Sequence, residues 1–383
     1  MARILFWTSV LAVSYAYVGY PLIVWMLARL TPRRVSKAGI TPTVSVVIAC
    51  HDEARNIEDR IKNLTASDYP KDRLEVIIVS DGSTDETVEL ARRNASDRVR
   101  VFAYPDQRGK AEALNLGVHA ADGDIVVFAD ARQRFEPNAI KELVANFSDQ
   151  SVGAVSGELV FRGGEDSSVR EGVGAYWRYE KWIRKNESRC GSVIGATGAI
   201  YAIRRELWMP LPSATILDDV FTPMQIALAG RRVVFEDKAV AYDSVAETAG
   251  HEFSRKVRTL AGNYQLCQLM PRLLVPTRAL VFQFYSHKLM RLAAPLFLLL
   301  LLAANVALAA SGIEGGMSYF YRAALACQLV FYFSATVGGY VLNLDRRVRL
   351  LNVAYVFSVM NAAALVSLIY VVFGKRNLWA RSE

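Results

Sequence analysis

Four loops carry charged side chains that could bind a nucleotide, and each lies where a predicted strand ends or a predicted helix begins. In chain order the loops contain Glu53, Asp81, the pair Arg108 and Lys110, and Asp130. Carboxylates can accept hydrogen bonds from ribose hydroxyls or a base N–H, and cations beside the free amides of a helix N-terminus can hold a diphosphate. Each loop alone could be an ordinary turn or a solvated first turn. Together, in this order, they predict a nucleotide site.

The elements that must position these loops alternate between apolar strands and helices. Strands are predicted at 44–50, 74–79, 99–104 and 125–128, and helices at 56–64, 85–94 and 110–121. This alternation is typical of a parallel sheet with right-handed crossovers, whose ligands bind at the carboxyl ends of the strands. The sequence therefore predicts an α/β domain with a mostly parallel sheet and its charged loops along one edge.

Six stretches between residues 43 and 262 carry a family resemblance. They are VSVVIACHDEARNIEDRIKNL, LEVIIVSDGSTDET, RGKAEALNLG, DIVVFADARQRFEPNAI, GATGAIYAIRREL and LDDV. In this order they resemble family 2 glycosyltransferases of the membrane-bound bacterial branch, which is related to cellulose, hyaluronan and poly-N-acetylglucosamine synthases. The resemblance implies a GT-A fold and a nucleotide-sugar donor, which we expect to be a UDP-sugar. By position, it places Glu53 and Asp81 at the nucleoside, Lys110 at the diphosphate and Asp130 at the diphosphate and metal.

The metal motif departs from the family pattern. Where the family usually has Asp-x-Asp, this chain has Asp130-Ala131-Arg132. Losing a carboxylate weakens a site for Mg²⁺ or Mn²⁺, because these cations prefer oxygen ligands. Either Asp130 and the substrate diphosphate suffice to hold a divalent cation, or Arg132 supplies positive charge directly to the leaving group. We expect the divalent cation to be retained.

Two adjacent carboxylates, Asp218 and Asp219, open a further predicted helix. Aspartate is a favourable N-cap residue, so one interpretation of the pair is structural. The resemblance implies instead that Asp219 is the general base, matching the last carboxylate of the family's Thr-Glu-Asp motif, with Asp218 in the Glu position. Given the upstream loops, we favour the base.

Acceptor contacts are expected from two further segments. Thr197 and Gly198 lie in a glycine-rich turn that borders the acceptor in the family, where the backbone can approach a substrate closely. Arg258 matches the arginine of the Gln-x-x-Arg-Trp motif of processive synthases, but the Gln and Trp are absent, so polymerisation and single transfer both stay open. The aromatic residues of the predicted helix at 171–188 favour packing over sugar stacking.

Four apolar runs without charged side chains predict membrane spans. They are Ile4–Ala28, Leu292–Ala310, Ala323–Leu344 and Leu350–Gly374, and a span needs about 20 residues. We expect a signal anchor rather than a cleaved signal in the first run. The predicted organisation is an anchor at 1–38, a catalytic domain at 39–250, amphipathic interfacial helices at 251–290, and three spans with a tail at 291–383.

The charge pattern indicates a membrane partner rather than a nucleic acid. The net charge is +8, but many basic residues flank the predicted spans, where orientation and anionic lipids explain them. The basic flank of the first span places the catalytic domain in the cytosol, at an inner or plasma membrane, although the basic tail conflicts with this orientation. The four cysteines show no paired spacing, which predicts reduced thiols, and the four scattered histidines argue against a histidine metal cluster.

Together these patterns predict an inverting glycosyltransferase that moves a sugar from a nucleotide to a lipid or glycan acceptor, in exopolysaccharide or envelope glycan synthesis. A single-sugar transferase that makes a glycolipid is one alternative. The other is a catalytically silent membrane module that binds nucleotide, motivated by the missing metal carboxylate and the missing Gln and Trp.

Overall fold

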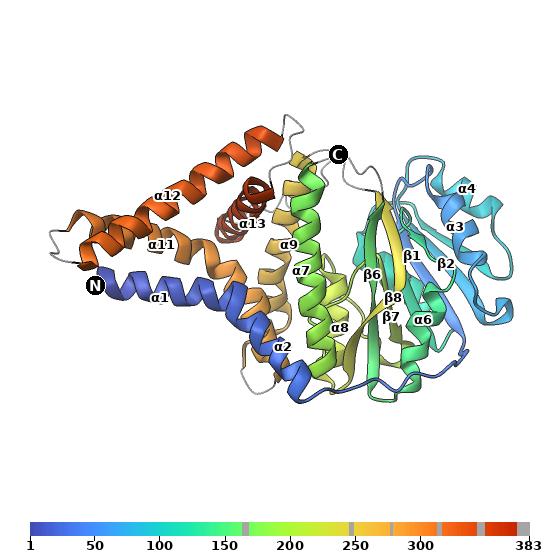
Figure 1. The fold of residues 1–383 in the computed structure, drawn as a ribbon. Coiled ribbons are helices and arrows are strands. Elements are labelled where there is room, and N and C mark those ends of the chain that lie inside the picture. The colour runs from blue at the N-terminus through green and yellow to red at the C-terminus, as the bar shows by residue number, and fades with distance from the viewer. Residues whose placement is uncertain (163–167, 245–248, 276–278, 312–315, 343–348, 374–383) are drawn as a thin grey trace. The chain divides into compact units, whose positions relative to one another are not determined.

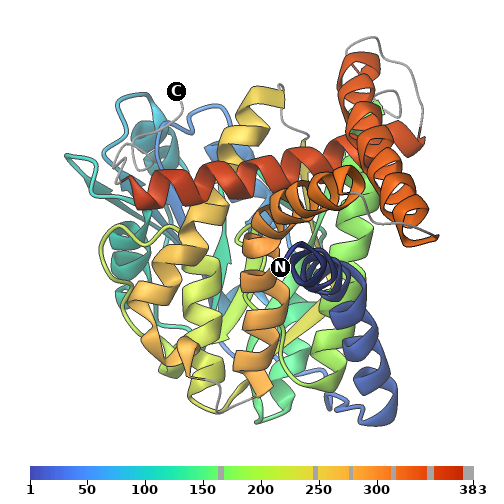
Figure 2. The ribbon, with the colours of Figure 1, turned by 90° about the vertical axis from the view of Figure 1, so that its left-hand side faces the viewer.

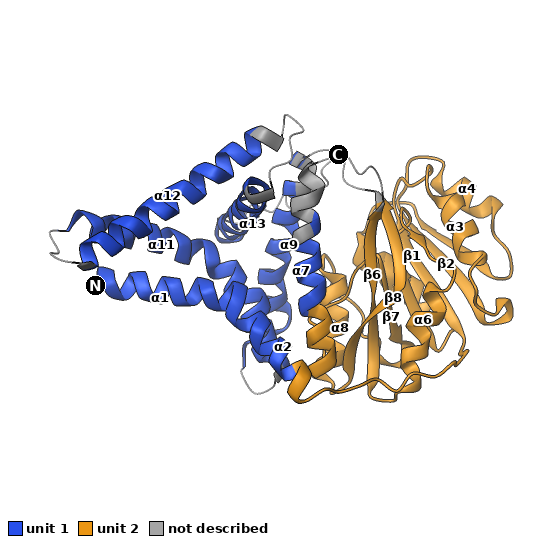
Figure 3. Cartoon of the chain, viewed as in Figure 1, with its two compact units in different colours: residues 1–27, 164–183, 246–383 blue, residues 28–163, 184–245 orange. Residues whose placement is uncertain are grey.

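The chain folds into two units, which are coloured separately in Figure 3. The computed structural model describes residues 1–162, 168–244, 249–275, 279–311, 316–342 and 349–373. The helical unit comprises Met1–Leu27, Gly164–Ile183 and Ala246–Glu383, and the sheet unit comprises Ala28–Gly163 and Arg184–Val245. Each unit is described by itself below.

An eight-stranded mixed sheet forms the centre of the sheet unit (Figure 1). Its strands are β1 Val44–Cys50, β2 Leu74–Asp81, β3 Val99–Tyr104, β4 Ile125–Ala129, β5 Arg134–Phe135, β6 Val152–Arg162, β7 Ile200–Arg204 and β8 Arg232–Ser244. They lie in the order β3-β2-β1-β4-β7-β6-β8-β5. Strands β3, β2, β1 and β4 are parallel, as predicted, whereas β7 runs antiparallel to both β4 and β6. The α/β class is confirmed.

Alternate side chains of the parallel strands pack against helices on opposite faces. Val46 and Ile48 of β1 belong to a buried cluster that also contains residues of α3 (Ile57–Thr65), α4 (Thr87–Arg93) and α6 (Ala139–Ala145). Val47, between them in sequence, faces Gly117 of α5 (Lys110–His119) on the other side. This period-2 alternation buries both faces of the strands and brings their carboxyl ends to one edge. The last helix of the unit is α8, Asp218–Leu228.

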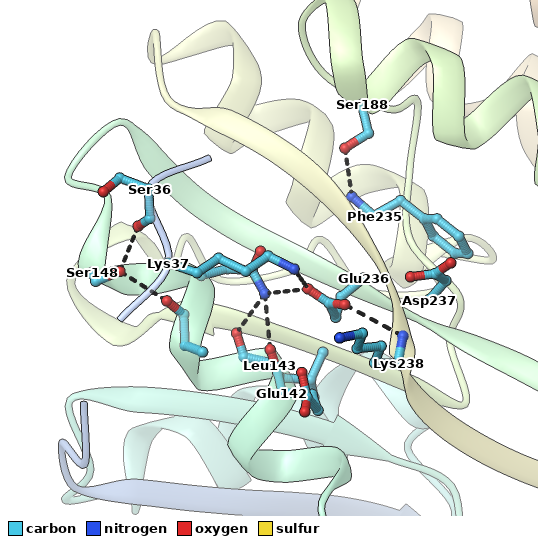
Figure 4. A network of polar contacts seen from close by, with 12 residues as sticks. Ser36, Lys37, Glu142, Leu143, Ser148, Ser188, Phe235, Glu236, Asp237 and Lys238 are labelled. Atoms are coloured by element: carbon cyan, nitrogen blue, oxygen red, sulfur yellow. Dashed lines mark hydrogen bonds and ion pairs between the residues drawn. The ribbon is translucent and has the colours of Figure 1, made fainter. Parts of the chain in front are cut away.

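The segment that follows the first apolar helix is held on the sheet unit by a buried carboxylate. Glu236 on β8 is 1% exposed and forms an ion pair with Lys37 (Figure 4). The same carboxylate accepts a hydrogen bond from Asn146 Nδ2 at 2.9 Å. One residue before Lys37, the carbonyl of Ser36 accepts from Ser148 Oγ at 2.6 Å. The segment is therefore fixed by paired polar groups.

Removing the cation of this network should destabilise the sheet unit. Lys37→Met removes the cation and leaves the buried carboxylate of Glu236 with two neutral donors, Asn146 Nδ2 and the Lys238 backbone amide. We expect the free energy of unfolding to fall by about 1–3 kcal/mol, less than for a fully buried pair because the Lys37 side chain is 44% exposed. The thermal midpoint of the detergent-purified protein should fall by about 2–8 °C. Lys238→Met is the matched control, since Lys238 contacts Glu236 through its backbone amide. Equal midpoints for the two variants would contradict the role of the ion pair.

The helical unit contains four helices that are long and apolar enough to cross a membrane, as predicted: Ala2–Leu30, Leu280–Ala310, Met317–Tyr340 and Leu351–Val372. The helices of the unit are α1 Ala2–Ser14 and α2 Tyr20–Leu30, joined by a π turn, α9 Ala249–Leu269, α10 Ala279–Gln283, α11 Met290–Ala310, α12 Gly316–Leu342 and α13 Arg349–Val372. Helix α1 packs against α11, and α13 packs against α9 (Figure 2). A π turn at Phe284–Leu289 joins α10 to α11, so the predicted boundary at residue 290 lies inside this apolar helix.

The aromatic helix α7 (Ser168–Cys190) belongs to the helical unit as far as Ile183, where packing and polar contacts hold it, and to the sheet unit from Arg184 on. Tyr179 Oη donates to the Tyr17 carbonyl at 2.6 Å, and the Lys256 ammonium lies 5.5 Å from the Trp177 ring centroid. Glu180 pairs with His287 and Arg291. These contacts favour the packing interpretation of the α7 aromatics. All four cysteines are free, and Cys50 is the one that is buried.

Candidate active site

Asp81 at the end of β2 holds the loop that leads to Lys110. Its carboxylate accepts hydrogen bonds from the backbone amides of Arg108 at 2.7 Å and Gly109 at 2.9 Å. Gly82 has φ +65°, and a Cβ there would lie 2.5 Å from the backbone of Asp106. Only glycine fits so close an approach in this conformation. Asp81 is buried and orders the neighbouring loop, while its contact with a nucleoside stays a prediction.

Glu53, after β1, is half-buried and fixed to the neighbouring loop. Its amide donates to Thr87 Oγ1 at 2.7 Å, and its carboxylate accepts from Asn56 Nδ2 at 2.7 Å. The preceding Asp52 has φ +51° and accepts from the amide of Thr84 at 2.8 Å. The first two charged loops are thus joined at the carboxyl ends of β1 and β2, where the sequence predicted them to meet.

Lys110 brings the predicted diphosphate site and the predicted base motif together. Its ammonium lies 3.0 Å from Asp130 Oδ1 and 3.8 Å from Asp218 Oδ1. A lysine in the first turn of a helix opposes the helix dipole, so α5 gains nothing from this placement. Desolvation lowers the pKa of Lys110, but the charges of Asp130 and Asp218 outweigh it and raise the pKa above its ordinary value. The ammonium stays charged at neutral pH.

Asp219 is held by the glycine-rich turn at 195–199. The Gly198 amide donates to Asp219 Oδ2 at 3.1 Å, and the Ala196 amide donates to the Asp219 carbonyl at 2.6 Å. A Cβ on Gly198 would lie 3.0 Å from Asp219 Oδ2, so any larger residue crowds the carboxylate. Thr197, between these amides, donates its own amide to Ser156 Oγ at 3.0 Å. The predicted acceptor turn and the predicted base are therefore in direct contact.

Arg132 forms a bidentate ion pair with a carboxylate that the sequence analysis missed. Its Nε and Nη2 donate to the two oxygens of Asp243 at 2.9 and 2.7 Å. Gln133 Nε2 donates to the same carboxylate at 2.9 Å. Hydrogen bonding and the Asp243 charge raise the pKa of Arg132, although partial burial opposes them. The only signal in the sequence is that Asp243 follows an apolar run, as Asp130 does.

The donor set around Asp130 fits a divalent cation held largely by substrate. Among the described residues there is no group of three or more Asp, Glu, His or Cys side chains able to hold a metal. Mg²⁺ is usually bound through one or two carboxylates together with substrate phosphates, so a single protein carboxylate is compatible with it. Asp130 is 36% exposed at its side chain and can reach such an ion.

Arg258 is on α9, in the helical unit, whereas the residues above belong to the sheet unit. Its side chain is exposed. The structure thus joins Lys110 to Asp130 and Asp218, joins Asp219 to Gly198, and pairs Arg132 with Asp243.

Part of the chain matches known glycosyltransferases in sequence. Residues 45–209 match the family model of glycosyl transferase family 2. Poly-beta-1,6-N-acetyl-D-glucosamine synthase from Staphylococcus aureus (strain COL) is 27% identical over 228 residues, which are 58% of this chain and 55% of that relative. The enzyme of the same name from Staphylococcus epidermidis is 23% identical over the same shares. This chain therefore spans about half the length of these curated relatives.

A solved structure is similar over nearly the whole chain. The mannosyltransferase PcManGT from Pyrobaculum calidifontis, in complex with GDP-Man and Mn²⁺, is 25% identical with a TM-score of 0.71. The similarity covers 96% of this chain and 99% of that one. These findings identify residues 45–209 as a glycosyl transferase family 2 domain with a GT-A fold, in a chain with four candidate membrane spans.

Proposed function

We propose that this protein is an inverting glycosyltransferase that transfers a sugar from a UDP-sugar to a glycan or lipid-linked acceptor at the cytosolic membrane face, in exopolysaccharide synthesis. The observation that carries the proposal is the ammonium of Lys110, which contacts both Asp130 and Asp218, the residue next to Asp219 in sequence. One cation and a separate carboxylate are what a displacement at an anomeric carbon requires.

In the proposed reaction Asp219 removes the proton from an acceptor hydroxyl. The hydroxyl oxygen attacks the anomeric carbon, the bond from that carbon to the diphosphate oxygen breaks, and the nucleoside diphosphate leaves with the bonding electrons. Lys110 stabilises the negative charge that develops on the leaving oxygen. When bound, a divalent cation at Asp130 supplies further positive charge there. The amide of Gly198 keeps the Asp219 carboxylate oriented during proton transfer.

Arg132 has a supporting part in this proposal. A guanidinium that already pairs with both oxygens of Asp243 is largely neutralised, so it contributes less charge to the leaving group than Lys110 does. This pairing supports retention of the divalent cation over its replacement by Arg132.

The donor and the metal requirement are tested together by nucleoside diphosphate release. Detergent-purified protein is assayed against a panel of UDP-sugars and GDP-sugars, with membranes as the acceptor source. We expect release from one UDP-sugar, lowered at least about 100-fold by chelator and restored by Mn²⁺ or Mg²⁺. If the release rate did not change when chelator was added, the metal assignment would be wrong. Arg132 would then be the group that supplies positive charge to the leaving diphosphate. No release from any donor would favour the silent module.

A single-sugar transferase is the second candidate, because the Gln and Trp expected around Arg258 are absent. Product length separates the two. Radiolabelled donor should give a ladder or a high-mass product if the protein polymerises, and a single lipid-soluble product if it adds one sugar.

A further inference from the structure

A guanidinium outside the predicted site ties the 195–199 turn to the sheet. Arg184 on α7 donates from Nη1 to Thr197 Oγ1 at 2.8 Å and from Nη2 to Ser156 Oγ at 2.6 Å. A planar guanidinium can bind two hydroxyls from different segments at once, which a lysine cannot do with the same geometry. Arg184 therefore joins a helix, the strand β6 and the turn.

The buried end of this contact is fully hydrogen-bonded. Ser156 is 0% exposed, and its Oγ accepts from Arg184 and from the Thr197 amide at 3.0 Å. Its own proton has an acceptor in the Gly157 carbonyl at 3.1 Å. A polar network whose members are all satisfied is rigid, because moving one member leaves a buried group without a partner.

The aromatic ring of Phe235 fixes the position of Arg184 itself. The Arg184 Cζ lies 5.0 Å from the centroid of this ring on β8. One helical turn farther along α7, Ser188 Oγ accepts a hydrogen bond from the Phe235 amide at 2.9 Å (Figure 4). Residues 184–188 of α7 are thus held against β8 at both ends. This fixes the position of the Arg184 guanidinium, which contacts the 195–199 turn.

We propose that Arg184 is a positioning residue for sugar transfer: it holds the 195–199 turn, whose Gly198 amide fixes the carboxylate of Asp219. The chain of contacts has three steps, from Arg184 to Thr197, along the backbone to Gly198, and from there to Asp219 Oδ2 at 3.1 Å. Misplacement of a reacting group by about 1 Å can cost about 100-fold in rate. This inference rests on the proposed function, because it takes Asp219 as the base.

Arg184→Met tests the inference, with Arg204→Met as the matched control. Arg204 also lies over a phenylalanine, 5.4 Å from the Phe147 centroid, and also donates to the β6 region, at the Val152 carbonyl. It lies at the far end of β7 from the turn. Both variants lose an arginine with packing and hydrogen bonds in the sheet unit, but only one loses contact with the turn.

Hydrogen exchange measures the positioning without requiring activity. In Arg184→Met the amides of Thr197 and Gly198 should exchange at least about 10-fold faster than in the wild-type protein, and in Arg204→Met their rates should be unchanged. Equal exchange of these amides in the two variants would overturn the proposal. This measurement stays decisive if the wild-type protein releases no nucleoside diphosphate, a result that would refute the proposed function instead.

Measurements of kcat and donor Kd distinguish a positioning role of Arg184 from a general effect on stability. Arg184→Met should lower kcat by about 10- to 100-fold while the donor Kd stays within about threefold. In a protein that already carries Thr197→Val, Arg184→Met should lower kcat by less than about a further threefold, because the hydroxyl that Arg184 contacts has already been removed. Arg184→Lys should recover part of kcat. Two results would contradict the proposal that Arg184 acts through the 195–199 turn. One is a loss of activity explained by weaker donor binding, and the other is a pair of kcat losses, from Arg184→Met and Thr197→Val, that are fully additive.

Discussion

Asp219→Asn should abolish sugar transfer while leaving donor binding intact. Asparagine has the same shape, and its side-chain oxygen can still accept from the Gly198 amide, so the 195–199 turn stays in place. It cannot take the proton of an acceptor hydroxyl, and losing a general base costs about 100- to 10,000-fold. We expect kcat to fall by about 1,000-fold, measured as nucleoside diphosphate release with acceptor, with the donor Kd within about threefold of the wild-type value.

Asp122→Asn is the control for this prediction, since the Asp122 side chain is 85% exposed and pairs with Arg100. It should transfer at nearly the wild-type rate. Transfer by Asp219→Asn within about tenfold of the wild-type protein would show that another group is the base. Asp218 would then be the next candidate, because its side chain is only 9% exposed and faces the same ammonium.

The parallel part of the sheet and its charged loops could be predicted from local patterns alone. Glu53, Asp81 and Asp130 each follow an apolar run that forms a strand, and β1, β2 and β4 pair as the alternation implies. Parallel strands with helical crossovers leave few alternative orders, so the edge that carries the loops follows from the chain order. Helices α4 and α5 end one and two residues earlier than predicted, and α3 ends one residue later, because local patterns do not define helix ends sharply.

The second half of the sheet could not be predicted in the same way. Strand β7 pairs with β4, and β8 pairs with both β6 and β5, so most neighbours in this part of the sheet are not consecutive strands in sequence. Such pairings depend on long-range packing rather than on local preference. The partners of Arg132 and Arg184 follow from them, since Asp243 lies 111 residues from Arg132 and Ser156 lies 28 residues from Arg184.

The contact between Lys110 and Asp218, inside the candidate site, is another long-range contact that local sequence patterns could not predict. The sequence analysis assigned Lys110 to the diphosphate and Asp218 to the base motif, without a reason to place them together. The structure puts the ammonium between Asp218 and Asp130, so one cation serves both groups of the proposed mechanism. The amphipathic stretch around Arg258 shows a different limit, because a basic helix indicates a membrane surface without locating an acceptor.

Lys110→Met should remove most of the catalytic rate. Methionine keeps the apolar stem but leaves Asp130 and Asp218 without the ammonium that lies between them. We expect kcat/KM for the donor to fall by about 100- to 1,000-fold, because charge on the leaving diphosphate loses a fixed partner. The change is measured as nucleoside diphosphate release at saturating Mn²⁺. Lys110→Arg should retain part of the rate, since the charge is kept but the geometry of a compact ammonium is not.

The pH dependence gives an independent check on the same lysine. Its pKa is raised, so the ammonium should stay protonated from pH 6 to beyond its ordinary value of 10.5, and the wild-type rate should show no alkaline loss from Lys110 below that pH. Lys141→Met, which removes an exposed lysine of α6, should match the wild-type protein in rate and pH profile. If Lys110→Met lost less than about fivefold in kcat/KM, the leaving group would depend on the cation at Asp130 and on Arg132 instead.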